Sequence, residues 1–556
     1  MLYMLPVPLL ACAALTLAQS EEPAFRADVT LQSIAVQVTD KQGQAVRGLA
    51  EANFTLLEDG RPQKIAFFGG ENQPISLLVL LDSSSSMKSS RKLAGAWALL
   101  GPLTHANLPE DEIWVAPFTD RVGAIERLPA AGRATPPAVN TISMGGGTAF
   151  YDALATGLCQ MRSARNVRQA IVAITDGSDQ HSRLHMEQLI QLAQASKPQI
   201  FMIGFFDPLE YSTYRDSDKT VTLVSGRDID NPLRLFERVA RETGAESFFP
   251  KSDKDLKDVI AHILGVLQTQ YTLAYYPRDI GKFRRIQVKV SRRDALVTAR
   301  RSAGLEGTNR EPVHFTAGSC SVSPADHPYP WEAHVTGSSA RAMIYQEDYS
   351  DPRSGWPNRP GSRYVPGGYE FRLGDGAPSN YSLPQNSTGG YTGEAIPMPA
   401  QTSGSGRSAA GDSILAAYGP FWRNFRASLS VEGIGEAARG MVFRLADEGC
   451  YMLLISGTDK SGDVSFKLVR RTFWNHVEKP LIPLTRIAGP ALAPGTSART
   501  SNRIGVECTG DRIAVLLNGA EVGAVNDPIY QDGYVGLAQF GYGRTLFRDL
   551  RVEGLP

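Results

Sequence analysis

The pattern of apolar and polar positions changes twice along this chain. Residues 27–73 alternate apolar and polar side chains, as in VTLQSIAVQVTD, and Asp59-Gly60 marks a hairpin turn within NFTLLEDGRPQKIAFF. From Ile75 the run ISLLVLL is continuously apolar, which is typical of a strand buried on both faces of a parallel sheet. These patterns predict an antiparallel β region followed by an α/β region.

Residues 74–269 alternate between strand and helix patterns. In the last predicted helix, apolar residues from Leu256 to Leu267 recur at helical spacing and form one stripe, and Ser252 with Asp255 resembles a capping box at its start. This alternation predicts a doubly wound α/β domain. The further predicted strands are EIWVAPF, QAIVAIT and QIFMIGFF, and the helices are TAFYDALATGLCQM, LHMEQLIQLAQAS, PLRLFERVARETG and SDKDLKDVIAHILGVLQ.

Strand patterns return after the α/β region and continue to the end. Neither residues 27–73 nor residues 270–303 are numerous enough for an independent core, so we expect them to pair as one small β domain into which the α/β domain is inserted. Residues 304–340 form a polar linker. Residues 341–556 are rich in strand and glycine signals, with a Ser-, Gly-, Pro- and Asn-rich loop insert near 374–412. The expected fold class is therefore multidomain, α/β plus all-β.

Charge and the N-terminal segment restrict the functional classes. The 57 basic residues balance the 57 acidic ones, which excludes the electrostatic footprint of a nucleic-acid-binding protein.

Residues 1–18 are apolar and predict a secretory signal peptide. The stretch Leu9 to Cys12 resembles a lipoprotein box, but the apolar run continues beyond it, so a lipid anchor at Cys12 is the less favoured alternative. No later apolar stretch is long enough to cross a membrane. We expect a secreted, periplasmic or cell-envelope protein.

The other cysteines do not form a disulfide framework or a zinc motif by spacing. These are Cys159, Cys320, Cys450 and Cys508, and no C-x-x-C is present. Cys450 and Cys508 both lie in strand patterns of the last region, and a disulfide between them is one alternative. Buried free thiols are the interpretation that we favour.

The segment Leu80 to Ser90, LLDSSSSMKSS, carries the first candidate for chemistry. Asp82 follows the apolar strand, at the edge where open α/β sheets bind ligands. In an extended loop alternate side chains point the same way, so Asp82, Ser84 and Ser86 converge while Ser83 and Ser85 point elsewhere. A carboxylate with two hydroxyls is a set of hard oxygen ligands suited to Mg²⁺, with Mn²⁺ and Ca²⁺ as alternatives.

Two further segments bring similar groups to the same edge. Thr148 follows three glycines and precedes a predicted helix, and Asp176 follows the strand QAIVAIT. Together, D-x-S-x-S, Thr148 and Asp176 resemble the metal-ion-dependent adhesion site of von Willebrand factor type A (VWA) domains. The resemblance implies that Ser84 and Ser86 contact the metal directly. Thr148 would do so directly or through water, and the two aspartates would act mainly through water and hydrogen bonds. An acidic residue of a partner protein would complete the coordination.

The flanking segments resemble other exported proteins. The segments VTDKQGQAVRGLAEANFTLLEDGRPQKIAFF and YTLAYYPRDIGKFRRIQVKV are similar to the flanks of secreted bacterial VWA-related proteins. Residues 341–556 resemble laminin-G/concanavalin-like jelly rolls, with Asn-Gly and Asp-Gly hairpins as in LNGAEV. Many domains of that kind bind glycans or proteins, and some are glycosidases.

The remaining candidates favour structural roles. The E-x-D-x-x-E strand of one jelly-roll glycosidase class is absent, and the carboxylates of the last region lie in turn-like contexts. The aromatic residues that resemble sugar platforms are more often core residues. His181 and His185 have the i,i+4 spacing of a zinc pair, but no third ligand is evident and we expect exposed helix histidines. Asp179 either orients the loop after Asp176 or caps a helix. The carboxylates are Glu347, Asp348, Asp351 and Asp527, and the aromatics are Trp356, Tyr364, Tyr369 and Trp422.

These observations predict a non-enzymatic, exported adhesion protein that holds an acidic residue of a partner protein through Mg²⁺. The jelly roll would add a second binding surface. The alternative is a carbohydrate-binding or glycoside-hydrolysing protein in which the jelly roll acts on glycans and the VWA domain serves for attachment.

Overall fold

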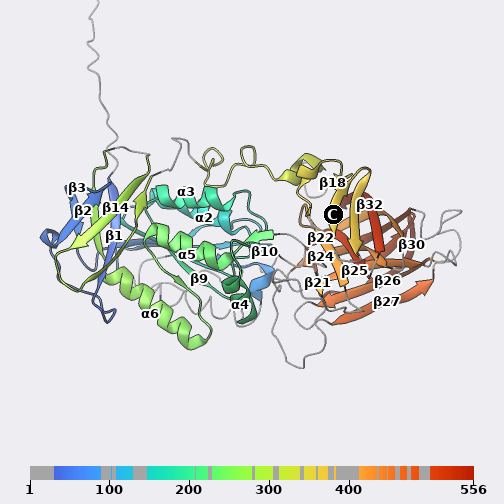
Figure 1. Ribbon diagram of the computed structural model, residues 1–556, viewed down its shortest axis with the longest axis horizontal. Helices are drawn as coiled ribbons and strands as arrows, with labels where there is room; N and C mark the ends of the chain where they lie inside the picture. Colours follow the sequence, from blue (N-terminus) through green and yellow to red (C-terminus); the bar gives the residue numbers. More distant parts are fainter. Residues whose placement is uncertain are drawn as a thin grey trace, which may run out of the picture.

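In the computed structural model of this chain, α/β and all-β regions follow one another as the sequence predicts (Figure 1). The small β region lies at one end, the α/β unit in the middle and a β-sandwich at the other end. The predicted signal peptide, Cys12 and most of the predicted 374–412 insert lie outside the described residues. The structure describes residues 31–88, 102, 108–128, 147–206, 208–222, 228–278, 282–304, 312–337, 343–358, 361–373, 381–382, 412–434, 437–446, 449–457, 464–472, 477–486, 501–541 and 543–556.

The small β region is built from both sides of the α/β unit. Strand β1 pairs with β13 and β15, and β2 pairs with β14, all antiparallel. The segments that the sequence analysis expected to pair therefore share two four-stranded sheets around one apolar core. The strands are β1 (Gln32–Thr39), β2 (Phe54–Glu58), β3 (Arg61–Gln63), β4 (Phe67–Gly69), β13 (Tyr271–Tyr275), β14 (Arg284–Val290), β15 (Leu296–Ala299) and β16 (Ser302–Ala303).

The α/β unit contains a six-stranded sheet in the order β12-β9-β8-β5-β6-β7, parallel except for the pairing of β6 with β7. The apolar run of β5 serves both faces, because Leu78 and Leu80 pack under α2, α3 and α5, whereas Leu77, Val79 and Leu81 pack against α6. The strands are β5 (Ile75–Asp82), β6 (Glu112–Phe118), β7 (Glu126–Arg127), β8 (Arg168–Thr175), β9 (Gln199–Gly204) and β12 (Ser247–Phe248).

The helices of this unit agree in place with four predicted ones and add one that was not predicted. They are α2 (Phe150–Gln160), α3 (Met186–Ala195), α4 (Pro208–Asp216), α5 (Pro232–Thr243) and α6 (Asp253–Thr269). Ser252 caps α6 by accepting a hydrogen bond from the backbone N–H of Asp255 at 3.1 Å. Helix α4 and the hairpin of β10 (Thr220–Thr222) and β11 (Asp228–Asp230) were absent from the prediction.

The C-terminal β-sandwich consists of a nine-stranded and a seven-stranded antiparallel sheet that enclose one large aromatic core. Asn518 and Gly519 have positive φ in the tight turn between β29 and β30, where the sequence predicted a hairpin. The strands are β17 (Val335–Thr336), β18 (Ile344–Glu347), β19 (Ser362–Val365), β20 (Gly368–Leu373), β21 (Tyr381–Ser382), β22 (Asp412–Ala417), β23 (Phe425–Ile434), β24 (Ala438–Ala446), β25 (Gly449–Gly457), β26 (Val464–Thr472), β27 (Glu478–Arg486), β28 (Asn502–Thr509), β29 (Arg512–Leu517), β30 (Ala520–Asn526), β31 (Tyr534–Phe540) and β32 (Gly543–Gly554).

The predicted linker is anchored to the α/β unit. Cys320 forms a disulfide with Cys159 of α2, and Val313 and Val322 are buried in the core beneath α2 and α3. This corrects the expectation that the cysteines form no disulfide. Cys450 and Cys508 are free and buried, so they do not pair.

The short helical turns in the described part of the chain are η1 (Glu51–Asn53), η2 (Ser85–Lys88), η4 (Met161–Ser163), η5 (Pro330–His334) and η6 (Pro352–Ser354).

Candidate functional site

The predicted site lies at the carboxyl edge of the parallel sheet. Strands β5 and β8 are direct neighbours in register, with Leu81 opposite Ile174, so Asp82 and Asp176 leave the sheet side by side. Edges of this kind gather side chains from several strands. All five predicted ligands are buried; the most exposed, Ser86, is 7% exposed.

Asp82, Ser84 and Ser86 converge within the loop after β5. The Oδ1 atom of Asp82 accepts a hydrogen bond from the backbone N–H of Ser84 at 2.8 Å. The hydroxyl oxygens of Ser84 and Ser86 are 3.0 Å apart. The helical turn η2 begins at Ser85, so the prediction of an extended loop is wrong from that residue on. The two hydroxyls nevertheless meet.

Ser83 points away from this group. Its hydroxyl donates to the carbonyl oxygen of Phe118 at the end of β6, at 3.0 Å, and its backbone N–H donates to the same oxygen at 2.9 Å. Ser83 therefore fastens the loop to the neighbouring strand, whereas Ser84 and Ser86 face each other. This difference makes Ser83 a matched control for the other two serines.

The end of β8 supplies a second carboxylate and a bridging hydroxyl. The Thr175 hydroxyl donates to Oδ2 of Asp82 at 2.5 Å and accepts from the backbone N–H of Gly177 at 2.9 Å. Burial, followed by the charge of Asp176, raises the pKa of Asp82 to about 7. Gly177 has φ 75°, and a Cβ there would lie 2.5 Å from the ring of Phe236, so the turn that carries Asp176 requires glycine.

Thr148 belongs to the adjacent loop, directly before α2. Its carbonyl oxygen accepts from the backbone N–H groups of Gln180 and His181, both at 3.0 Å. Its own N–H donates to Nδ1 of His181 at 3.2 Å. These hydrogen bonds join Thr148 to the loop after β8, which also carries Asp176. The other three predicted ligands, Asp82, Ser84 and Ser86, lie at the end of β5 and just after it.

The chemistry of the donors fits a divalent cation. Burial raises the pKa of Asp82, the charge of Asp176 raises it further, and a cation between the two carboxylates removes their repulsion. The paired hydroxyls of Ser84 and Ser86 add hard oxygen donors. Asp82, Ser84, Ser86 and Asp176 could hold the cation, and both the ligand set and the metal stay predictions.

Asp179 both orients the loop and caps a helix. Its Oδ2 atom accepts from the backbone N–H of Tyr151 in the first turn of α2 at 2.9 Å, and from the hydroxyl of Ser182 at 2.6 Å. In the opposite direction, the carboxylate of Asp152 in α2 accepts hydrogen bonds from the backbone N–H groups of Arg183 and Leu184 in the loop. Burial raises the pKa of Asp179 to about 7 and that of Asp152 to about 6.

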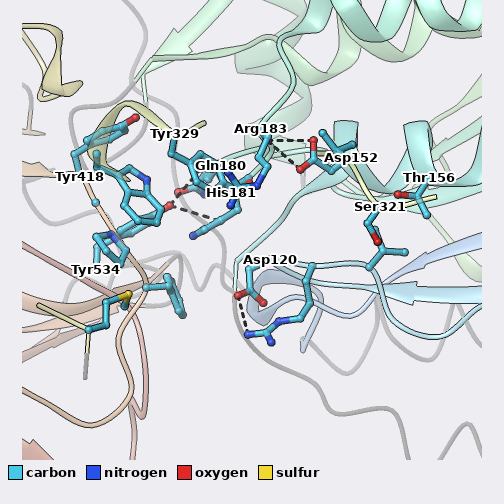
Figure 2. A pocket seen from close by; sticks show the side chains of 18 residues that line it. Asp120, Asp152, Thr156, Gln180, His181, Arg183, Ser321, Tyr329, Tyr418 and Tyr534 are labelled. Atoms are coloured by element: carbon cyan, nitrogen blue, oxygen red, sulfur yellow. Dashed lines mark hydrogen bonds and ion pairs between the residues drawn. The ribbon is translucent and has the colours of Figure 1, made fainter. Parts of the chain in front are cut away.

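His181 lies between two domains, a position that no local sequence pattern indicates. It lies in the loop before α3 rather than on a helix, and only His185 is exposed, so the expectation of two exposed helix histidines is wrong for His181. Its ring stacks on Tyr534 of the β-sandwich at 5.1 Å and meets the edge of Phe421 at 5.2 Å. The phenol of Tyr329 donates to its carbonyl oxygen (Figure 2).

The candidate residues of the sandwich itself are engaged in structural contacts. Trp356, Tyr369 and Trp422 are buried in the aromatic core, and Tyr364 packs against it. The carboxylates are held by local contacts: Glu347 accepts from the backbone N–H of Tyr349, Asp348 from Ser350 and Asp351 from Arg353. Asp527 accepts from the hydroxyl of Tyr451 and pairs with Arg470. These contacts agree with turn and core roles.

Comparisons with known proteins give distant likenesses among solved structures. No protein-family model matches the chain, and no curated protein matches it. Among solved structures, the chain is similar to a von Willebrand factor type A protein from Catenulispora acidiphila, with 11% identity over 51% of this chain and 76% of that one and a TM-score of 0.28. It is also similar to an aerotolerance-related membrane protein from Bacteroides fragilis NCTC 9343. The identity is 19% over 34% of this chain and 98% of that one, with a TM-score of 0.26.

The third likeness concerns a carbohydrate-binding module, CBM66, from Bacillus subtilis. Its identity is 18% over 26% of this chain and 84% of that one, with a TM-score of 0.20. Within the described part of the chain, no helix has the length and apolar character needed to cross a membrane.

Proposed function

We propose that this chain is an exported binding protein of the VWA type, with a laminin-G/concanavalin-like domain at its C-terminal end. In this proposal a divalent cation, Mg²⁺ in the first place, binds among Asp82, Ser84, Ser86, Thr148 and Asp176. An acidic side chain of a partner protein completes the coordination, and the chain acts by binding rather than by catalysis.

The observation that carries the proposal is the meeting of two buried carboxylates with two paired hydroxyls at one sheet edge. Asp82 has a raised pKa because it is buried beside Asp176, and the Ser84 and Ser86 oxygens are 3.0 Å apart. A structural role alone gives no reason to bury like charges together, since that arrangement costs stability. A cation supplies the missing opposite charge.

Export is supported by the disulfide. Cys159 and Cys320 are 161 residues apart and joined, and disulfides form and persist mainly in oxidising compartments. This agrees with the apolar N-terminal segment, which predicts a signal peptide.

Metal-dependent capture of a partner tests the proposal. The full chain would be immobilised and exposed to envelope extract in Mg²⁺ and in EDTA, beside the variants Ser86→Ala and Ser83→Ala. We expect one or more proteins to bind in Mg²⁺, to be released by EDTA and to be lost with Ser86→Ala, while Ser83→Ala retains them. Capture that is equal in EDTA, or equally weakened by both substitutions, would overturn the proposal.

A further inference from the structure

A cavity of about 450 Å³ opens where three parts of the chain meet. The α/β unit contributes Asp120 and Gln180, the linker contributes Ser321, and the β-sandwich contributes Tyr418 and Tyr534. Figure 2 shows Tyr418 and Tyr534 on one side of it and Ser321 on the other. Its volume falls within the ~300–1,000 Å³ of small-molecule sites, and such sites form preferentially between domains.

Aromatic rings dominate one side of this interdomain cleft. Trp331 stacks on Tyr329 with ring centroids 4.9 Å apart and planes 13° apart, and both side chains line the cleft. Trp331 and Tyr418 are half-buried, in contrast to the fully enclosed Trp356 and Tyr369 of the sandwich core. The cleft therefore presents aromatic surface that the core aromatics cannot present.

Both arginines of the cleft lie close to acidic residues. Its lining contains two aspartates and two arginines. Arg183 forms two hydrogen bonds with the carboxylate of Glu332, at 2.7 and 3.1 Å, and places its guanidinium 4.1 Å from the ring centroid of Tyr329. The carboxylate of Asp120 lies 3.6 Å from the guanidinium of Arg121 and accepts from the hydroxyl of Thr119. Arg183, the arginine with the close contacts, is therefore already engaged and is a poor partner for a phosphorylated or carboxylated ligand.

A ligand for this lining is uncharged, has flat apolar faces and carries many hydroxyl groups. Aromatic rings pack against the C–H faces of a pyranose, and amide, hydroxyl and carboxylate groups satisfy its hydroxyls. Gln180, Ser321 and Asp120 provide those three kinds of group around the cleft. We propose that the cleft between the α/β unit, the linker and the β-sandwich binds a short neutral saccharide.

The walls of the cleft are held in place before any ligand arrives. The Cys159–Cys320 disulfide fixes the linker directly beside Ser321, and the stack of His181 on Tyr534 joins the α/β unit to the sandwich. Preorganised walls reduce the entropy lost on binding. The saccharide site therefore depends on the arrangement of domains, and its lining contains none of the five proposed metal ligands.

Titration with neutral disaccharides tests the inference. The probes would be cellobiose, maltose, sucrose and N,N′-diacetylchitobiose, added to the full chain in EDTA and followed by calorimetry and by tryptophan fluorescence. We expect at least one probe to bind, and the variants Trp331→Ala and Tyr418→Ala each to weaken it tenfold or more. Trp331→Phe should retain part of the affinity because it keeps an aromatic face.

Tyr276→Ala is the matched control, since Tyr276 is 55% exposed and lies outside the cleft. It should bind the probe like the unchanged protein. No binding of any probe at about 10 mM would overturn the inference, as would binding that survives both Trp331→Ala and Tyr418→Ala. The use of EDTA keeps this outcome separate from the proposed metal-dependent function, which fails or succeeds on other residues.

Discussion

The imidazole ring of His181 stacks on the phenol ring of Tyr534, with centroids 5.1 Å apart and planes at 11°. One residue belongs to the loop that follows β8 and the other begins β31 of the sandwich. Because Nδ1 of His181 also accepts from the N–H of Thr148, a single side chain connects the predicted metal site to the neighbouring domain. A change at either end of this connection should therefore be measurable at the other.

Gly147 allows that connection to be broken from the metal side. A Cβ at this position would lie 1.8 Å from Cε1 of His181, so Gly147→Ala must displace the imidazole from Tyr534. We expect Gly147→Ala to lower the free energy of unfolding by about 1–3 kcal/mol and to increase protease cleavage between the domains.

The double variant provides the control. In Gly147→Ala/His181→Ala the obstructing ring is absent, so the second substitution should add less than its effect in the unchanged protein. A double-mutant cycle measured by chemical denaturation would show a coupling of about 1 kcal/mol or more. Strict additivity would contradict the close packing of Gly147 against His181.

The disulfide gives a prediction that mass spectrometry can check. Alkylation in denaturant without reductant should label Cys450 and Cys508 but leave Cys159 and Cys320 unlabelled, and added reductant should expose all four. The double variant Cys159→Ser/Cys320→Ser should lose about 2–5 kcal/mol of stability, because the bond closes a long loop. Labelling of Cys159 without reductant would show that the linker is not tethered to α2.

The pH dependence of stability should report Asp179. Burial raises its pKa from 3.8 to about 7, so between these values the folded protein holds a proton that the unfolded chain has released. Because the native state binds more protons there, the free energy of unfolding falls as pH rises from about 4 to about 7. Asp152, whose pKa is raised to about 6, acts in the same direction.

Asp179→Asn isolates this contribution. Denaturation in EDTA across that pH range should show a shallower fall in stability for Asp179→Asn than for the unchanged protein, by an amount on the order of a few kcal/mol. Parallel curves for the two proteins would mean that Asp179 does not titrate in this range.

The sequence predicted those parts of the fold that follow from local patterns. The continuous apolar run of β5 implied burial on two faces, and the structure divides its residues between two cores. The Asn518-Gly519 pair implied a tight hairpin, and both residues have positive φ. In each case the sequence signal, an uninterrupted apolar run or an Asn-Gly pair, lies within a few residues along the chain. Helix α4 and the β10–β11 hairpin escaped prediction because their short segments show little apolar periodicity.

In the candidate site, too, local features were predicted from the sequence and contacts between distant segments were not. Alternation after β5 implied that Ser84 and Ser86 meet, and their oxygens are 3.0 Å apart. The disulfide escaped because Cys159 and Cys320 are 161 residues apart and the linker has no regular pattern. The role of His181 escaped because its i,i+4 spacing to His185 suggested a helix, whereas α3 begins only at Met186. Contacts between domains leave no periodic signal in either partner.

Direct measurement of metal binding tests the central claim most sharply. Mg²⁺ and Mn²⁺ would be titrated by calorimetry into the unchanged protein and into Ser84→Ala, Ser86→Ala and Ser83→Ala, with circular dichroism as the check on folding. We predict one divalent site that is weakened at least tenfold, or about 1.4 kcal/mol, by Ser84→Ala and by Ser86→Ala. Ser83→Ala should bind the metal nearly as well, since its hydroxyl is engaged by the carbonyl of Phe118. A folded protein that binds no divalent cation, or equal losses from all three substitutions, would contradict the account.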